Sequence, residues 1–333
     1  MPRTNRPFLR KRLLPGILIA VLFLAAVEVV FRLAGIGDKP LDLTPFFLDH
    51  RGGEQLYDPD PDLFWKLHPN PDRSINDKGI RGRESLATKT KFRILCLGDS
   101  ITYGFRLDAG KTYPAYLQGF FGDRAEVIAA GVPGYSIVQG FRYYGRDLDA
   151  LDADLVLIQF GFNDRLEAYV PDSQQPHVPN WARSLHATLG KLHLYGLLVS
   201  LGRDAEPEPG TVRVTPEEFA ETCHLLDDKI NGSKGAPVFL IMPHFDRDTG
   251  AISVESYRPP SDVPTIDASA YFHMIPADRR QQYFIDSIHL TATGNHFLAK
   301  MLAQELDDRL LLPDSASQGM VPVLPQHEET DGE

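Results

Sequence analysis

Cysteine and positive charge are both scarce in this chain. Two of the 333 residues, Cys96 and Cys223, are cysteines, which excludes a framework of several disulfides. Lysine and arginine number 34 against 45 acidic residues. Residues 1–37 hold six of the basic residues and one acidic residue, which leaves 28 basic against 44 acidic residues, a charge of −16, in the rest. With this negative charge, the part of the chain after residue 37 is a poor partner for nucleic acid.

The signatures of several cofactor-dependent classes of enzyme are also missing. The sequence has no GxxxxGK[ST] phosphate loop, no GxGxxG dinucleotide fingerprint and no HExxH zinc motif. It shows no internal repeat. We therefore expect neither an organic cofactor nor a metal ion.

One long apolar run is present, close to the N-terminus. Residues 13–31 read LLPGILIAVLFLAAVEVVF, and five basic residues precede them. As a helix these residues would rise about 28 Å, close to the thickness of a hydrocarbon core. Basic flanks favour the cytoplasmic side. We predict a cytoplasmic segment at 1–12, a single-pass transmembrane anchor at 13–34 and an extracytoplasmic remainder, periplasmic in a bacterium; a cleaved signal sequence is the alternative.

Residues 35–90 and residues 91–312 differ in composition. Residues 35–90 are rich in Pro, Asp, Asn and Gly, which predicts an extracytoplasmic spacer. From residue 91, apolar runs alternate with helical stretches. The candidate strands are 92–97, 126–130, 154–160, 237–242 and 264–267, and the candidate helices include 113–121, 138–148, 215–231 and 291–311. The strands lack strict alternation, as in a sheet covered on both faces.

This β-α order predicts an α/β fold with a three-layer α/β/α, flavodoxin-like architecture and a mostly parallel, five-stranded sheet. Residues 170–214 interrupt the order as an insert that contains an apolar helical stretch at 181–202. The insert is either a lid or pocket wall over a site or a helix that covers the core. Residues 313–333 hold five acidic residues and no lysine or arginine, which predicts a disordered tail.

Polar residues follow three of the predicted strands and occupy the last loop of the sheet domain. They lie in GDS at 98–100, GVPG at 131–134, GFND at 161–164 and DSIH at 286–289. In a doubly wound sheet, function collects at the carboxyl ends of the strands. A serine at a helix start becomes a nucleophile when a histidine takes its proton and a carboxylate orients that histidine. Each motif has a structural alternative, as a helix cap or a turn.

The four motifs together resemble the sequence blocks of the SGNH, or GDSL-type, serine hydrolases. The matching segments are LGDSITYG, AAGVPGYS, GFNDR and DSIHLTATG, within residues 92–308. Ile101 and Ala129 depart from the usual leucine and asparagine of these blocks.

The resemblance implies a nucleophile, Ser100, a base, His289, and an aspartate, Asp286, that orients the base. It implies an oxyanion hole from the N–H of Ser100, the N–H of Gly134 and the side-chain amide of Asn163. We take Gly134 rather than Gly131 as the oxyanion glycine, from its spacing to the residues that follow. His244, after the fourth strand, is a weaker candidate for substrate binding.

The resulting hypothesis is an extracytoplasmic serine esterase that hydrolyses carboxylic esters, including acyl groups on glycans or lipids, through an acyl-enzyme. Its expected partners are the acylated substrate and, through the N-terminal helix, a lipid bilayer. Two alternatives remain at this point. One is an O-acyltransferase that acts on exported polysaccharide, and the other is a non-catalytic glycan-binding module on the same fold. The substrate, the acyl chain and the oligomeric state are not predicted.

Overall fold

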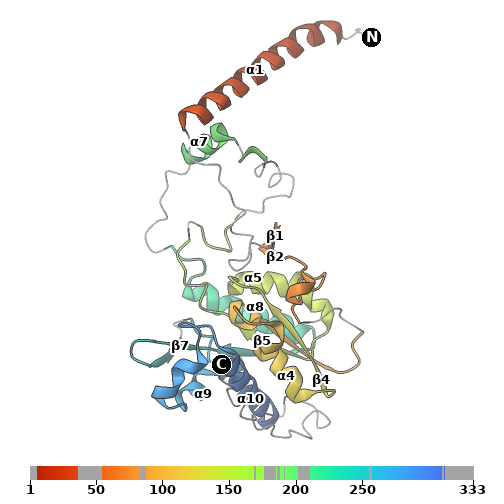
Figure 1. Ribbon diagram of the computed structural model, residues 1–333. Coiled ribbons are helices and arrows are strands. Elements are labelled where there is room, and N and C mark those ends of the chain that lie inside the picture. Colours follow the sequence, from red (N-terminus) through yellow and green to blue (C-terminus); the bar gives the residue numbers. More distant parts are fainter. Residues whose placement is uncertain are drawn as a thin grey trace. The chain divides into compact units, whose positions relative to one another are not determined.

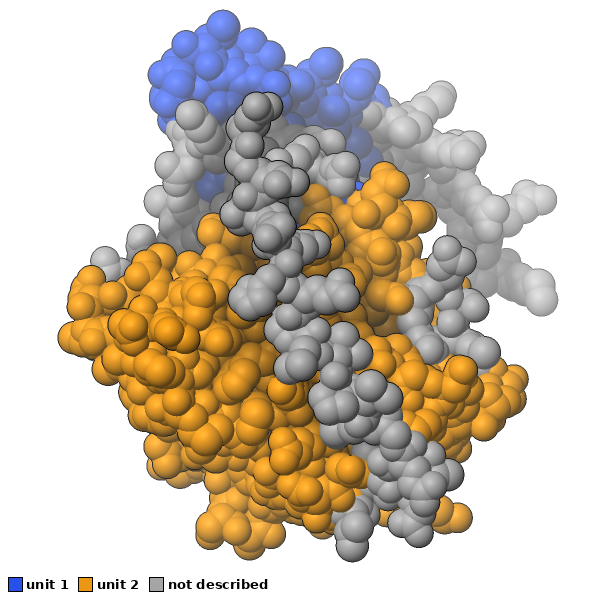
Figure 2. Space-filling model, turned by 60° about the horizontal axis from the view of Figure 1, so that its bottom comes forward, with its two compact units in different colours: residues 1–61, 176–209 blue, residues 62–175, 210–333 orange. Residues whose placement is uncertain are grey.

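The chain forms two compact units, which are blue and orange in Figure 2. Residues 1–61 and 176–209 make up the first unit, and residues 62–175 and 210–333 the second. The computed structural model describes residues 6–36, 55–82, 88–168, 170–175, 185, 188–190, 192–201, 211–254, 257–309 and 311. The predicted acidic tail at 313–333 and most of the insert's helical stretch before residue 192 lie outside the described residues.

A parallel sheet of five strands forms the centre of the second unit (Figure 1). Its strands are β3 (Phe92–Gly98), β4 (Ala125–Gly131), β5 (Leu155–Gln159), β6 (Ala236–Ile241) and β9 (Thr265–Asp267), in the order β4-β3-β5-β6-β9. All five predicted strands are therefore present, and the order is that of a flavodoxin-like sheet. Strands β3, β4 and β5 are almost wholly buried, which explains why their sequences do not alternate.

Helices cover both faces of this sheet. Helices α4 (Tyr113–Phe121) and α10 (Ala292–Asp308) pack together on one face, and α5 (Ile137–Tyr143) and α8 (Pro216–Gly232) pack together on the other. Side chains of β3 alternate between the two layers, and Ile94 and Cys96 join the core cluster that includes Leu117 of α4 and Leu298 of α10. The prediction of a three-layer α/β/α fold is confirmed.

Short elements complete the second unit. They are β2 (Phe64–Leu67), α3 (Ser100–Tyr103), β7 (Pro243–Phe245), β8 (Ile252–Val254), α9 (Ser269–His273), 3₁₀ turns at Pro71–Arg73, Ala109–Lys111, Asp149–Leu151 and Ala277–Tyr283, and a π-helical turn at Tyr144–Leu148. The π-helical turn continues α5, so the predicted helix 138–148 is one helical segment with a change of pitch.

The second unit begins at Asp62, well before the predicted boundary at residue 91. Leu63, Leu67, Ile75 and Ile80 are each at most 2% exposed. The Arg81 guanidinium is also buried and donates hydrogen bonds to the carbonyls of residues that follow the nucleophile motif, Tyr103 at 2.5 Å and Leu107 at 2.6 Å. The second half of the segment predicted as a spacer thus packs as part of the core.

The first unit contains α1 (Arg6–Ala34), β1 (Tyr57–Asp60) and α7 (His193–Leu201). Within α1, Pro15–Ala34 form a 20-residue stretch with a hydropathy of 2.5. By length and composition it could cross a membrane, although a signal sequence would meet the same criteria.

Candidate active site

The nucleophile candidate Ser100 begins a short helix directly after β3. The Asp99 side chain caps this helix, because its Oδ1 accepts a hydrogen bond from the N–H of Ile101 at 2.8 Å. A Cβ added to Gly98 would lie 2.2 Å from Thr102 Oγ1, so the glycine allows α3 to lie against the strand end. Gly104, at φ +74°, ends the helix after one turn. The N–H of Ser100, at the helix start, has no acceptor within the helix.

Ser100, His289 and Asp286 form a continuous chain of hydrogen bonds. His289 Nε2 lies 2.9 Å from Ser100 Oγ, and His289 Nδ1 lies 2.8 Å from Asp286 Oδ2. The Ser100 residue is 8% exposed and the His289 side chain 13% exposed. The structure thus brings together three residues that are up to 189 positions apart in the sequence, in an arrangement that suits proton transfer from the serine to the imidazole.

The D-x-x-H spacing works because the aspartate folds its own loop. Asp286 Oδ1 accepts hydrogen bonds from the N–H groups of Ile288 at 3.0 Å and His289 at 2.9 Å. Burial alone would raise the pKa of the Asp286 carboxyl. Hydrogen bonds from the His289 ring and from the two backbone N–H groups outweigh this effect and hold the pKa well below its usual range. Asp286 therefore stays ionised beside the imidazole.

The two glycines of the second motif have different environments. A Cβ on Gly131 would lie 2.2 Å from the backbone nitrogen of Tyr103, so the lack of a side chain at this position allows α3 to pack against the end of β4. Gly134 lies beyond the strand in a loop, at φ +83°. Gly131 thus has a packing role under α3, and the assignment of Gly134 as the oxyanion glycine stays a prediction.

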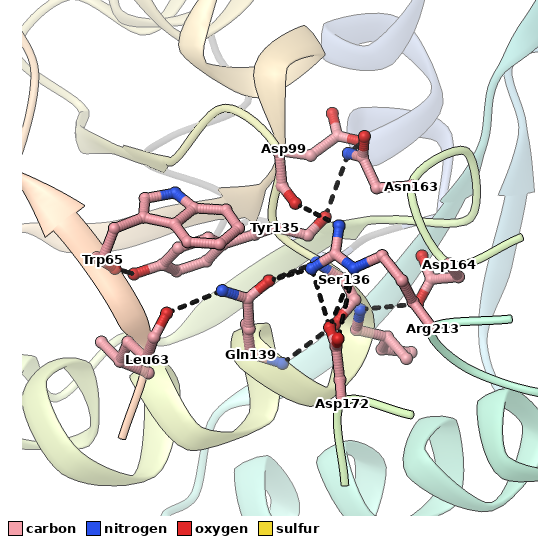
Figure 3. A network of polar contacts seen from close by, with 12 residues as sticks. Leu63, Trp65, Asp99, Tyr135, Ser136, Gln139, Asn163, Asp164, Asp172 and Arg213 are labelled. Atoms are coloured by element: carbon pink, nitrogen blue, oxygen red, sulfur yellow. Dashed lines mark hydrogen bonds and ion pairs between the residues drawn. The ribbon is translucent and has the colours of Figure 1, made fainter. Parts of the chain in front are cut away.

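Asn163 lies after β5, at the point where the sheet order reverses direction between β3 and β5. Its side chain is close to Asp99, as Figure 3 shows. The amide nitrogen donates to Asp99 Oδ2 and to the carbonyl of Tyr135, both at 3.1 Å. These two bonds fix the orientation of the amide, and an oxyanion would have to share one of its protons.

Two residues outside the predicted motifs hold the loop that contains Gly134. The indole Nε1–H of Trp65 donates to the Pro133 carbonyl at 3.2 Å, and Arg213 Nη1 donates to the Gly134 carbonyl at 2.7 Å. In a planar trans peptide the C=O and N–H point in opposite directions, so the bond to Pro133 directs the N–H of Gly134 away from Trp65. Both peptides that flank the Gly134 Cα are therefore positioned by side chains.

Arg213 is itself fixed by a buried ion pair (Figure 3). Its Nη2 lies 2.7 Å from Asp172 Oδ2, and the same carboxylate oxygen accepts the Ser136 hydroxyl at 2.7 Å. Asp172 and Arg213 stand at the two ends of the insert, where the N–H of Asp172 donates to the Arg213 carbonyl at 2.7 Å. The base of the insert therefore braces the Gly134 loop, a role that the sequence did not indicate.

Asp164 braces the neighbouring loop from a fully buried position. Its oxygens accept the N–H groups of Ile137 at 2.8 Å and Gly161 at 2.9 Å. Burial is the largest influence on this carboxyl and raises its pKa to about 7, against the opposing effect of these hydrogen bonds and of Arg213. Its contacts are with the backbone, so Asp164 supports the shape of the site.

Phe105 and His244 complete the description of this region. The Phe105 ring packs on the His289 imidazole with a centroid distance of 4.7 Å and thereby limits the rotation of that ring. His244 lies half-buried in β7, next to Phe245, whose N–H donates to the Ser287 carbonyl at 2.7 Å. The backbone of β7 thus adjoins the Asp286–His289 loop, and substrate binding by His244 stays a prediction. Among the described residues, no group of three or more His, Cys, Asp and Glu could hold a metal ion.

A Ser-His-Asp chain at the carboxyl edge of a flavodoxin-like sheet is the kind of site that serine hydrolases use. The sequence pattern of the GDSL-like Lipase/Acylhydrolase family matches residues 96–297, more than half of the chain. The protein belongs to this family, as the motifs predicted. Trp65 lies before the matched region, which explains why the motifs did not reveal it.

Individual relatives match over shorter stretches. An arylesterase of Vibrio mimicus is 31% identical over 90 residues, which cover 26% of this chain and 45% of the arylesterase. The thioesterase 1/protease 1/lysophospholipase L1 of Escherichia coli K12 is 29% identical over 82 residues, 25% of this chain and 39% of that protein. The chain thus spans less than half the length of these relatives. The crystal structure of a lipase/acylhydrolase from Enterococcus faecalis is similar to 65% of this chain and 96% of its own, with 17% identity and a TM-score of 0.42.

Proposed function

We propose that this protein is a membrane-anchored, extracytoplasmic serine esterase. The observation that carries the proposal is the hydrogen-bonded chain from Ser100 Oγ through His289 to Asp286, at 2.9 and 2.8 Å. Membership of the lipase/acylhydrolase family supports the reaction class. The apolar helix at Pro15–Ala34, preceded by basic residues, supports the location.

In the proposed reaction, Ser100 Oγ attacks the ester carbonyl carbon while His289 Nε2 takes the hydroxyl proton. The carbonyl oxygen becomes an oxyanion, which the N–H groups of Ser100 and Gly134 and the Asn163 amide stabilise. His289 returns the proton to the alcohol, which leaves as the C–O bond breaks and an acyl-enzyme remains. Water then attacks the acyl carbon, His289 takes its proton, and the carboxylic acid departs as Ser100 regains its hydrogen.

The Ser100→Ala substitution tests this proposal. The purified full chain is assayed against short-chain esters, long-chain lipid esters and acetylated polysaccharide, and is treated with a serine-directed phosphonate. We expect the wild type to hydrolyse at least one ester class and to be labelled, and the variant to lose both properties with its thermal unfolding unchanged. Ser253→Ala, at an exposed position in β8, should retain both. Labelling that persists in Ser100→Ala would contradict the assignment of the nucleophile.

The same assays separate hydrolysis from acyl transfer. A hydrolase releases free acid in the absence of any sugar acceptor, because water takes the acyl group. An enzyme that releases no free acid, and instead moves the acyl group from the ester onto a hydroxyl of an added polysaccharide, would be an O-acyltransferase. If the folded wild-type protein neither hydrolyses nor transfers any of these acyl groups, a non-catalytic binding module would be favoured.

A further inference from the structure

Helix α7, at the end of the insert's helical stretch, is an apolar element within the first unit. Its sequence is HLYGLLVSL, with no lysine, arginine, aspartate or glutamate. Leu198 is 59% exposed and Leu192, just before the helix, is 37% exposed. A nine-residue helix is too short to be stable alone in water, so its stability depends on what covers its apolar surface.

Glu28, one of two charged residues in the candidate membrane span together with Arg32, binds the N-terminus of α7. Its Oε1 accepts the N–H of His193 at 2.9 Å, and its Oε2 accepts the N–H of Leu194 at 3.0 Å. Arg32 Nε donates to Oε1 at 2.8 Å, and Glu28 is 9% exposed. One carboxylate therefore joins α1 to α7 and accepts hydrogen bonds from two backbone N–H groups that have no acceptor within the helix.

The contact with Glu28 determines where along the membrane span α7 begins, and therefore how deep in a bilayer α7 would lie. Glu28 lies six residues before Ala34, the last residue of the apolar stretch, which is about 9 Å at 1.5 Å per residue. A stretch of 20 residues about 30 Å long fills a hydrocarbon core. The start of α7 would then lie within the apolar boundary of the bilayer, at the end of the span that leads to the rest of the chain.

At that depth the two partners stabilise each other. An unpaired carboxylate is costly in hydrocarbon, and so are free N–H groups at a helix start. The pairing of Glu28 with α7 and Arg32 satisfies both. It also accounts for the presence of Glu28 and Arg32 in the span, which an anchor that contacts lipid alone would not need.

We propose that α7 is a second membrane contact, with Leu198 and the adjoining Leu192 among the acyl chains of the leaflet at the C-terminal end of the α1 span. The inference rests on the proposed membrane anchor and adds to it a role for the helix at the end of the insert. The occupant of the apolar surface of α7 is therefore phospholipid, not a second copy of the chain or another protein.

Site-specific fluorescence of the full chain in lipid bilayers tests this inference. Single cysteines replace Leu198 in α7, Leu24 in the span and Leu225 in α8, which are 59%, 51% and 44% exposed. Cys96 and Cys223 are buried and burial raises the pKa of both thiols, so an environment-sensitive thiol reagent labels the introduced cysteines. The bilayer contains phosphatidylcholine with a spin label at a shallow or a deep position of the acyl chain.

We expect the label at Leu198→Cys to be quenched most by the shallow spin label, the label at Leu24→Cys most by the deep one, and the label at Leu225→Cys by neither. Quenching at position 24 without quenching at position 198 would overturn the α7 proposal and leave the anchor intact. Absence of quenching at both positions would overturn the anchor as well. The label at position 198 could instead be shielded from water only at a high ratio of protein to lipid, without quenching by the lipid spin labels. That result would identify a second copy of the chain as the occupant and contradict the proposal.

The role of Glu28 is tested on the same labelled protein. Glu28→Ala should remove the quenching at position 198 and leave that at position 24 unchanged, because only α7 loses its attachment. Val29→Ala, a change at an exposed neighbouring position of α1, should alter neither signal. Full quenching at position 198 in Glu28→Ala would show that the carboxylate does not hold α7 at the bilayer.

Discussion

At the scale of single residues, Trp65 has the most direct influence on the proposed oxyanion site from outside the family motifs. Its indole binds the peptide that carries the N–H of Gly134, and its ring lies 3.1 Å from the position that a Cβ of Gly134 would take. The Tyr135 hydroxyl donates to the Trp65 carbonyl at 2.6 Å and holds the tryptophan backbone in turn. Trp65 acts through Gly134, so it is a positioning residue.

Trp65→Phe should lower kcat by about 2- to 10-fold, the equivalent of one hydrogen bond of roughly 0.5–1.5 kcal/mol. The indole N–H is lost while a ring remains beside Gly134, so KM and the unfolding temperature should change little. Steady-state kinetics and the affinity for a phosphonate analogue of the transition state measure the effect. Tyr135→Phe removes a bond of similar strength that does not touch the Pro133 carbonyl, and should leave kcat closer to that of the wild type. Equal kcat in the wild type and Trp65→Phe would contradict the positioning role.

Asp286 gives a prediction for pH. Its pKa is held well below the usual range in the folded protein, so below about pH 4 the unfolded chain binds more protons than the folded one. The stability that Asp286 contributes is therefore present above about pH 4 and is lost as the pH falls further. The unfolding free energy from urea titrations should decrease more steeply on acidification in the wild type than in Asp286→Asn. Parallel curves for the two proteins would contradict the lowered pKa.

At the scale of elements, the site depends on how closely α3 approaches the sheet. The sheet register places Gly98 opposite Gly131, and α3 rests on both strand ends. A Cβ at Gly131 would meet backbone atoms of Thr102 and Tyr103, which cannot rotate away as a side chain could. The position of Ser100 relative to His289 therefore depends on the absence of a side chain at both Gly98 and Gly131.

Gly131→Ala should reduce stability by about 1–3 kcal/mol, as overpacking does, and should lower kcat in the folded fraction by displacing Ser100. Gly119→Ala is the matched control, because this exposed glycine of α4 has nothing within 4 Å of an added Cβ. The control should be neutral or more stable by roughly 0.5–1 kcal/mol, from helix propensity. Thermal unfolding and kcat are measured on both variants. An active Gly131→Ala protein of wild-type stability would show that α3 tolerates displacement.

At the scale of the whole molecule, charge and hydropathy divide the chain into a basic, apolar N-terminal part and an acidic body. If α1 is an anchor with its basic end in the cytoplasm, a reporter that is active only outside the cytoplasm should be active when fused after residue 40. The fusion should remain with the membrane fraction after an alkaline wash. Activity with release of soluble protein would favour a cleaved signal sequence, and cytoplasmic activity would overturn the orientation.

The order of secondary structure could be predicted from the sequence because it depends on local patterns. The five strands and the helices at 113–121, 215–231 and 291–311 are present with ends that differ by at most three residues. Threonines at 112, 215 and 291 cap these helices, a signal contained in a few neighbouring residues. The lack of alternation in the strands correctly indicated a sheet covered on both faces.

The sequence by itself determined the family, the βα order and the motifs that meet at one sheet edge, because the carboxyl ends of parallel strands lie together in any such fold. Only the tertiary structure decided which side chains brace those motifs. Trp65 and Arg213 contact the Gly134 loop from 68 and 79 residues away in the sequence, and Asp172 holds Arg213 through an ion pair. No local pattern marks such contacts. The contact of Glu28 with α7 spans 165 residues for the same reason. Long-range hydrogen bonds depend on the packed positions of whole elements, and these positions exist only once the chain has folded.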